Sequence, residues 1–223
     1  MGQDVTLTSS DGFKLGAYRA DPKGTPKGAV VVIQEIFGVN HHIRAVTDRL
    51  AEAGYVAIAP AVFDRMQKDF QTGYTPDDIT KGREMAGKAD RPAMMRDTQA
   101  AIDSVKDVGK VGITGFCMGG TIVFLAAAQL SGLSAAVAYY GGQIAQNVEQ
   151  KPKVPTMMHF GEKDAGIPLS DVEIVKQKQP QAEVYVYPEA QHGFHCDERA
   201  SFQKEASTQA WQRTLEFLTK HMK

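Results

Sequence analysis

Residues 110–120, KVGITGFCMGG, decide the fold of this chain. The apolar run over residues 110–114 is typical of a buried strand, and a helical pattern begins at Gly119. Cys117 lies between them, with Gly115 and Gly119 two residues away on either side, which is the Gly-x-nucleophile-x-Gly spacing of a sharp strand-to-helix turn. Such a turn strains its middle residue and leaves no space for bulky side chains at the two glycines. It would hold the Cys117 sulfur above the edge of a sheet.

Two other interpretations of this stretch fit it less well. Most isolated cysteines are small buried apolar residues, in which case the glycines would merely turn the chain. A phosphate-binding loop would need the lysine and spacing of a P-loop or a GxGxxG pattern, and neither occurs here. Because the strand and the helix fall where the turn requires them, we favour a nucleophilic Cys117.

Apolar runs and helical patterns alternate along the rest of the chain. The runs are mostly continuous, as in strands buried on both faces, and cover residues 29–33, 56–59, 110–114, 135–139, 156–160 and 184–187. The helical patterns cover residues 43–53, 91–105, 119–130, 169–177 and 203–221. This alternation predicts an α/β protein with a mostly parallel, doubly wound sheet and helices on both faces.

Two segments depart from the alternation. Residues 5–8 and 15–20 flank Asp11-Gly12, a dipeptide that readily adopts the positive φ values of a tight turn, so we predict an N-terminal antiparallel hairpin. Residues 62–91 are polar and weakly periodic apart from a helix that starts near Asp77. We interpret this second segment as an excursion that covers the site.

Length and composition are those of an ordinary globular protein. The chain has 223 residues, 43% of them hydrophobic, and no linker, so we expect one domain over residues 1–223 and a monomer. Lys and Arg number 25 against 26 Asp and Glu, without a basic run, which argues against a nucleic-acid partner. The N-terminus lacks a signal-peptide pattern and no apolar stretch could span a bilayer, so we expect a cytoplasmic protein without a membrane partner.

Two later loops supply an acid and a base in the order of a catalytic triad. Asp164 follows the predicted strand 156–160, and His192 follows the predicted strand 184–187. The order nucleophile, acid, histidine is that of the α/β-hydrolase fold, in which the imidazole exchanges a proton with the nucleophile and the carboxylate holds its tautomer. Taken singly, Asp164 is also typical of a helix cap and His192 of a solvated loop. Their joint placement favours catalysis.

The other histidines and the second cysteine give no further site. None of the histidines shows the HExxH spacing of a zinc site, so we expect no metal. No cofactor is implied either, because the chain itself supplies a nucleophile and a base. No elbow precedes Cys196, which we interpret as an incidental thiol near the site, with a redox partnership with Cys117 as the alternative.

Four segments together resemble the dienelactone hydrolase (carboxymethylenebutenolidase) family, and the resemblance covers most of the chain. They are QEIFGVN at residues 34–40, GFCMGG at 115–120, YYG at 139–141 and AQHGF at 190–194. The resemblance implies that Glu35 reaches over Cys117, and that the backbone N–H groups of Ile36 and Met118 form an oxyanion hole. The second implication agrees with the general placement of such donors, one after the nucleophile and one after an early strand.

The resemblance also implies hydrolysis of a small ester or lactone through a thioester on Cys117. Family members that act on the dienelactone carboxylate carry an arginine four residues after the catalytic histidine, where this chain has Cys196. Arg65 is similar in place to another carboxylate-binding arginine of the family, and Arg199 lies just beyond Cys196, so both are candidates to bind the substrate. A broader carboxylesterase or thioesterase, and a non-catalytic thiol sensor or ligand-binding protein of the same fold, stay open as alternatives.

Overall fold

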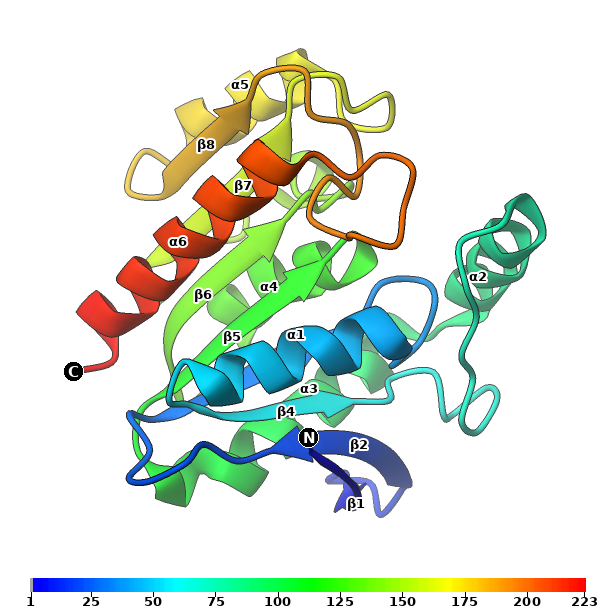
Figure 1. The fold of residues 1–223 in the computed structure, drawn as a ribbon, viewed down its shortest axis with the longest axis vertical. Coiled ribbons are helices and arrows are strands. Elements are labelled where there is room, and N and C mark those ends of the chain that lie inside the picture. Colours follow the sequence, from blue (N-terminus) through cyan, green and yellow to red (C-terminus); the bar gives the residue numbers. More distant parts are fainter. Residues whose placement is uncertain (1) are drawn as a thin grey trace.

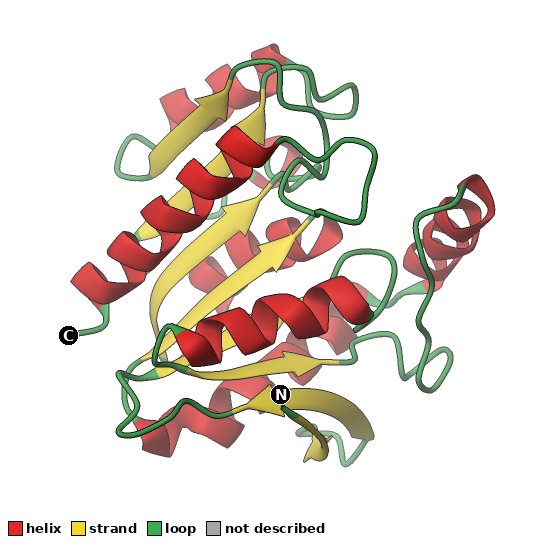
Figure 2. Cartoon of the chain, in the orientation of Figure 1, coloured by secondary structure: helices red, strands yellow, loops and turns green. Residues whose placement is uncertain are grey.

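One eight-stranded sheet runs through the computed structural model, which describes residues 2–223 (Figure 1, Figure 2). The spatial order of its strands is β1-β2-β4-β3-β5-β6-β7-β8. The strands from β3 to β8 are parallel, whereas β2 pairs antiparallel with both β1 and β4. Their bounds are β1 Gln3–Thr8, β2 Lys14–Ala20, β3 Ala29–Ile33, β4 Val56–Pro60, β5 Val111–Phe116, β6 Leu133–Tyr139, β7 Thr156–Gly161 and β8 Glu183–Tyr187. The predicted mostly parallel sheet is confirmed.

Helices cover both faces of this sheet, as predicted. In Figure 1, α1 and α6 lie in front of the sheet, and α3, α4 and α5 lie behind it. The helix α2 projects from the side of the body, within the predicted excursion. The bounds are α1 His41–Glu52, α2 Pro76–Lys88, α3 Arg91–Val105, α4 Met118–Gln129, α5 Leu169–Lys178 and α6 Lys204–His221, and short 3-10 helices cover Lys106–Val108 and Ala145–Asn147.

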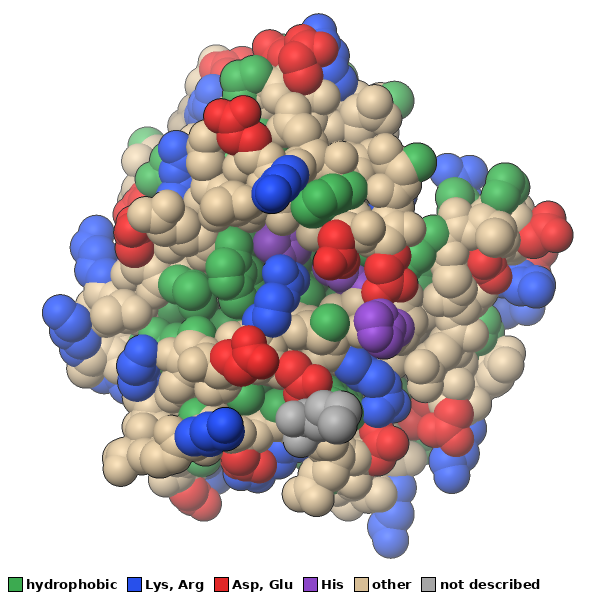
Figure 3. Space-filling model, viewed as in Figure 1, with side chains coloured by type: hydrophobic (Ala, Val, Ile, Leu, Met, Phe, Trp, Pro, Cys, Tyr) green, Lys and Arg blue, Asp and Glu red, His purple; other side chains and the backbone are tan. Residues whose placement is uncertain are grey.

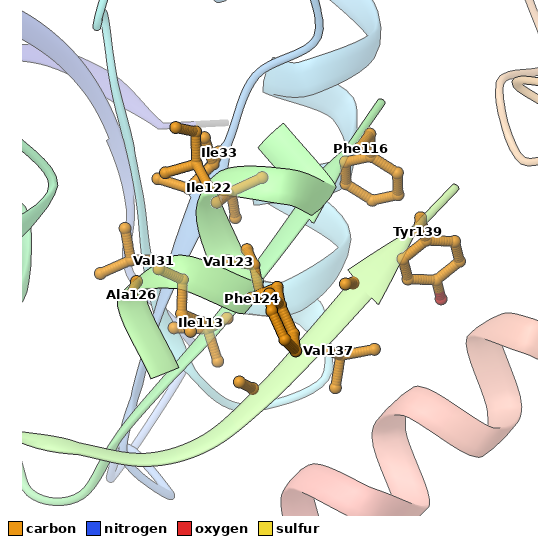
Figure 4. Packing of buried hydrophobic residues seen from close by; sticks show 14 of the residues in the cluster. Val31, Ile33, Ile113, Phe116, Ile122, Val123, Phe124, Ala126, Val137 and Tyr139 are labelled. Carbon is orange, nitrogen blue, oxygen red and sulfur yellow. The ribbon is translucent and has the colours of Figure 1, made fainter. Parts of the chain in front are cut away.

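The centre of the fold is the packing of α4 against β3, β5 and β6. Every residue of β3 and β5 is buried, and residues 119–128 of α4 are buried as well. Ile113, Val123 and Phe124 lie among the apolar side chains that Figure 4 shows in this layer. Each fully buried side chain of this size stabilises the fold by about 1.5–3 kcal/mol, so the segment that carries Cys117 is anchored in the best-packed part of the molecule.

The N-terminal hairpin is confirmed, but its turn is wider than predicted. The loop comprises residues 9–13, in which the Ser9 N–H donates to the Phe13 carbonyl at 2.8 Å and the Gly12 N–H donates to the Ser9 carbonyl at 2.9 Å. Gly12 has a φ of +84°, whereas Asp11 keeps a negative φ and accepts a hydrogen bond from the Phe13 N–H instead. The Asp11 side chain therefore stabilises the turn by accepting a hydrogen bond within it. Asp11 does not adopt the positive φ that we expected.

Local signals set the bounds of the excursion helix. The Thr75 hydroxyl accepts from the Asp78 N–H and the Asp78 carboxylate accepts from the Thr75 N–H, which is a capping box, and Pro76 occupies the first helical position. Only Gly82 and Met85 of α2 are buried. No helix in residues 2–223 has the length and apolar character needed to cross a bilayer. Charges of both signs are interspersed on the face that Figure 3 shows, in keeping with the net charge of -1.

A buried histidine on β7 makes the stability of this fold depend on pH. His159 is fully buried, with Nε2 3.2 Å from Thr214 Oγ1 and Nδ1 2.9 Å from the Tyr187 hydroxyl. Burial, assisted by the positive charge of Arg213, lowers the pKa of His159 to about 3, so the folded protein keeps it neutral. In the unfolded chain its pKa returns to about 6.5. Between these two values, the unfolded state binds a proton that the folded state does not.

We therefore expect the free energy of unfolding to fall with decreasing pH below about 6.5, by up to about 1.4 kcal/mol per pH unit from His159 alone. His159→Gln should flatten this dependence, and urea unfolding between about pH 7 and pH 4.5 measures it. His41→Gln is the matched control, because Glu198 raises the pKa of this exposed histidine and its contribution has the opposite sign. Equal slopes for the wild-type protein and His159→Gln would contradict the prediction.

Candidate active site

The turn between β5 and α4 has the strained geometry that the sequence predicts. Cys117 has φ +56° and ψ −117° and is the N-cap of α4. A Cβ atom on Gly115 would lie 2.7 Å from the Gly119 carbonyl oxygen, and one on Gly119 would lie 2.4 Å from the Ile33 carbonyl oxygen. Side chains at these two positions would clash with the backbone. The half-buried Cys117 side chain is left at the carboxyl edge of the sheet.

The structure brings Asp164 and His192 together from the loops after β7 and β8. Nδ1 of His192 lies 2.7 Å from Oδ2 of Asp164, and Oδ1 of Asp164 accepts a hydrogen bond from the Gly166 N–H at 2.8 Å. The Asp164 side chain is 0% exposed, whereas that of His192 is 28% exposed. Because Nδ1 is held by Asp164, Nε2 is left free to interact with Cys117, which lines the same cavity as His192.

The protonation of His192 is set by opposing effects. Burial disfavours the imidazolium, but the neighbouring Cys117 sulfur and the Asp164 carboxylate favour it more strongly, so that the pKa of His192 rises to about 10. This arrangement allows His192 to take the proton of Cys117 and hold it for a leaving group.

Cys117 and His192 face one cavity of about 490 Å³. Ile36 and Met118 line the same cavity, as predicted for oxyanion donors. The Met118 N–H is at the first position of α4, where helical N–H groups have no partner in the helix, and the Ile36 N–H donates to no group within residues 2–223. The rest of the lining is mostly apolar and comprises Ala86, Ala89, Arg91, Met94, Thr121, Ile122, Gly142 and Gln143.

The carboxylate of Glu35 has two hydrogen-bond partners in the structure. It is fully buried and accepts from Arg199 Nη1 at 3.1 Å through Oε1, and from the Tyr74 hydroxyl at 3.3 Å through Oε2. A buried carboxylate requires such partners, because desolvation without them costs several kcal/mol. Arg199 therefore has a role in the site, but as the counterion of Glu35.

Arg65 pairs with carboxylates outside the cavity, and its role in substrate binding stays a prediction. Its guanidinium donates twice to Asp97 at 2.8 Å and also pairs with Asp11 at 2.9 Å, and it lies over the ring of Phe13. Two carboxylates thus bind the Arg65 guanidinium, and Arg65 is not among the described residues that line the cavity. The sequence correctly placed Arg65 after the end of β4, but the direction of the side chain depends on partners in the hairpin and in α3.

Sequence reasoning missed the arginine that does line the cavity. Arg91 is the first residue of α3, directly after the N-cap Asp90, and its guanidinium donates to the Gln143 side chain. Gln143 comes from the segment after β6, where the Thr121 hydroxyl accepts from its backbone N–H at 3.1 Å. The sequence feature that could have identified Arg91 is its position at the end of the excursion, where the chain returns to the sheet.

Cys196 is a thiol in the folded protein. It is fully buried, and burial together with the negative charge of Glu35 raises its pKa to about 12. Since a thiolate is the reactive form of cysteine, this agrees with the expectation that Cys196 is not a second nucleophile. The ligand atoms of Cys196, Glu35 and His42 lie within 4.8 Å of one another. The expected absence of a metal from the reaction stays a prediction.

A strained elbow after β5, with Asp164 in the loop after β7 and His192 in the loop after β8, is the arrangement of an α/β-hydrolase. Comparison with known proteins agrees. The model of the dienelactone hydrolase family matches residues 15–222, and this chain belongs to that family.

Relatives in this family match nearly the whole chain. Carboxymethylenebutenolidase from Pseudomonas putida is 31% identical and covers 97% of this chain and 95% of its own length. A Synechocystis sp. protein provisionally assigned the same activity is 36% identical, with 98% and 96% covered. The crystal structure of a Klebsiella pneumoniae protein, provisionally assigned as a dienelactone hydrolase, has a TM-score of 0.84 at 34% identity and covers 99% of both chains. The protein is therefore a carboxymethylenebutenolidase-like hydrolase.

We expect Asp164→Asn to lower the pKa of His192, because the carboxylate contributes both a hydrogen bond and a negative charge. A wrong tautomer of the ring should also lower kcat by a factor on the order of 10² to 10⁴. An NMR titration of the His192 imidazole measures the first effect directly. Asp171→Asn, in the first turn of α5, is the control. An unchanged His192 pKa in Asp164→Asn would refute the role of this pair.

Proposed function

We propose that this hydrolase cleaves small esters or lactones with Cys117 as nucleophile, through a thioester acyl-enzyme. The observation that carries the proposal is the geometry of Cys117, which is held at a strained elbow and faces the same cavity as a histidine whose Nδ1 lies 2.7 Å from Asp164. A nucleophile, a base and an orienting group in contact are the elements of covalent acyl transfer. No cofactor is needed for these steps, and we propose a cytoplasmic monomer.

The reaction proceeds in two halves. His192 takes the proton of Cys117, the sulfur attacks the substrate carbonyl, and the negative charge develops on the carbonyl oxygen. The tetrahedral intermediate collapses with cleavage of the C–O bond, and the leaving oxygen receives the proton from His192. Water then attacks the thioester with His192 as base, which releases the acid and restores the Cys117 proton.

The N–H groups of Ile36 and Met118 supply the electrostatic part of this catalysis. The support for this role is that both residues line the cavity beside Cys117, where the oxyanion would form. Losing one such donor typically costs about 3 to 4 kcal/mol of transition-state stabilisation.

The cavity indicates a substrate with an apolar body and a negative group. Its lining is mostly apolar, and among the described residues Arg91 is its one basic side chain apart from His192. The name of the Pseudomonas putida relative describes a butenolide with a carboxymethylene group, which is a lactone of this kind. We propose that Arg91, assisted by Gln143, binds such a carboxylate in place of Arg65.

A carboxylesterase or thioesterase for neutral substrates is the second candidate. Arg199 is occupied by Glu35, and Cys196 stands where dienelactone-specific relatives carry an arginine, so only Arg91 is left to recognise an anion. In the thiol-sensor alternative, Cys117 would not catalyse the hydrolysis of either kind of ester.

Turnover of a dienelactone and of neutral p-nitrophenyl acetate separates these candidates. We expect the dienelactone to be preferred in kcat/KM and Cys117→Ala to abolish both activities, because the nucleophile is lost. Turnover of the neutral ester alone would favour the general esterase. If neither substrate is hydrolysed, or if Cys117→Ala retains full activity, the proposed mechanism is wrong.

For Arg91→Gln we expect KM for the dienelactone to rise about tenfold or more, since a charge-assisted hydrogen bond contributes about 1.5–3 kcal/mol. KM for p-nitrophenyl acetate should stay unchanged, because this ester carries no anion. Arg96→Gln, on the same helix but bound to Asp11, is the matched control. A parallel loss for both substrates in Arg91→Gln would show a structural role instead.

A further inference from the structure

A second group of chemically reactive side chains is buried beside the triad. Glu35 follows β3, His42 lies in the first turn of α1, and Cys196 lies in the loop before α6; all three are at most 1% exposed. Their ligand atoms, one from each residue, lie within 4.8 Å of one another. The proposed reaction uses neither His42 nor Cys196, so the convergence of these three side chains needs a separate explanation.

His42 is the strongest sign that the group binds something. Within residues 2–223, neither ring nitrogen of His42 has a hydrogen-bond partner, although the side chain is 1% exposed. The nearest carboxylate oxygen, Oδ1 of Asp197, is 3.6 Å from Nδ1, which is too long for a hydrogen bond. A buried polar group without a partner costs about 1–3 kcal/mol, and such groups are rare in folded proteins. A ligand that accepts the imidazole lone pair would remove this cost.

We propose that Glu35, His42 and Cys196 bind one thiophilic divalent cation, with Zn²⁺ as the best match. A sulfur, an imidazole nitrogen and a carboxylate oxygen are the ligand types that Zn²⁺ prefers, and three protein ligands leave a fourth position for water. In a tetrahedral site, ligand atoms are about 3.4 Å apart, so the three side chains need to approach one another by about 1 Å.

The charges and existing contacts permit this binding. The cation replaces the proton of the Cys196 thiol, which is released to solvent, so that the new thiolate adds one negative charge to that of Glu35, beside which Arg199 stays. Arg199 and Tyr74 each donate a hydrogen bond to one of the two Glu35 carboxylate oxygens. A carboxylate has about four lone-pair sites, so Glu35 can hold the cation as well.

A second cluster, partly at the surface, adjoins the buried group. His42 also belongs to a second cluster, with Asp197 and Glu198, whose ligand atoms lie within 4.8 Å of one another. These two carboxylates are solvent-exposed. Exposed carboxylates raise the local concentration of cations, and the shared histidine connects them to Glu35 and Cys196.

Cobalt spectroscopy of Cys117→Ala tests the proposal without depending on catalysis, because this background removes the other thiol. We expect one equivalent of Co²⁺ to give a thiolate-to-cobalt charge-transfer band, which Zn²⁺ abolishes by displacement. The band should be absent from Cys117→Ala/Cys196→Ser. Cys117→Ala/His42→Gln should bind Zn²⁺ more than about tenfold more weakly, whereas Cys117→Ala/His41→Gln, which changes the exposed neighbour, should bind as Cys117→Ala does.

A second measurement covers the case in which a substitution impairs folding. Zn²⁺ should raise the thermal unfolding midpoint of Cys117→Ala, because a ligand that binds only the folded state stabilises it. The rise should be smaller in the His42→Gln background. Absence of the charge-transfer band from Cys117→Ala, or a band that survives Cys196→Ser, would overturn the proposed site.

Discussion

The site depends on how closely three pieces of backbone meet at Cys117. The end of β3 approaches Gly119, whose added Cβ would lie 2.4 Å from the Ile33 carbonyl oxygen, and the end of β6 approaches Gly120 in the same way at the Tyr139 carbonyl oxygen. A single methyl group at either glycine would separate these segments. The contact between these segments holds Cys117 and the loop that carries Ile36 in one rigid unit. The packing of the core, and not the conformation of flexible loops, therefore sets the geometry of the site.

Charge pairing is the second constraint on the site. Asp164 and Glu35 are both buried carboxylates, and each has its own cation, His192 and Arg199. Breaking such a pair by removing one partner typically costs about 3–5 kcal/mol, because the other charge stays buried. The pairing with Arg199 therefore compensates the negative charge of Glu35 inside the protein.

Most of the fold was predictable from sequence because its signals are local. The bounds of β3 and α3 follow from a continuous apolar run and from Pro92 after a capping Asp90, and the elbow follows from two glycines. Side-chain directions were not predictable. Glu35 and Arg65 both follow strands, but the groups that bind their side chains, Arg199 for Glu35 and Asp97 for Arg65, are distant in sequence. The contact of Arg91 with Gln143 joins segments 52 residues apart, which no periodicity reveals.

Because of the projecting helix α2, the shape of the substrate pocket can change independently of the residues proposed to carry out the reaction. Only two residues of α2 are buried, yet Ala86 and the adjacent Ala89 line the cavity in front of Cys117. Substitutions here reshape the substrate pocket while leaving the elbow, the triad and the sheet untouched, and surface positions of this kind usually alter stability by less than about 0.5 kcal/mol. Evolution can therefore explore new specificities in this segment at little risk to folding, and the same freedom makes it the natural region for a focused mutagenesis library.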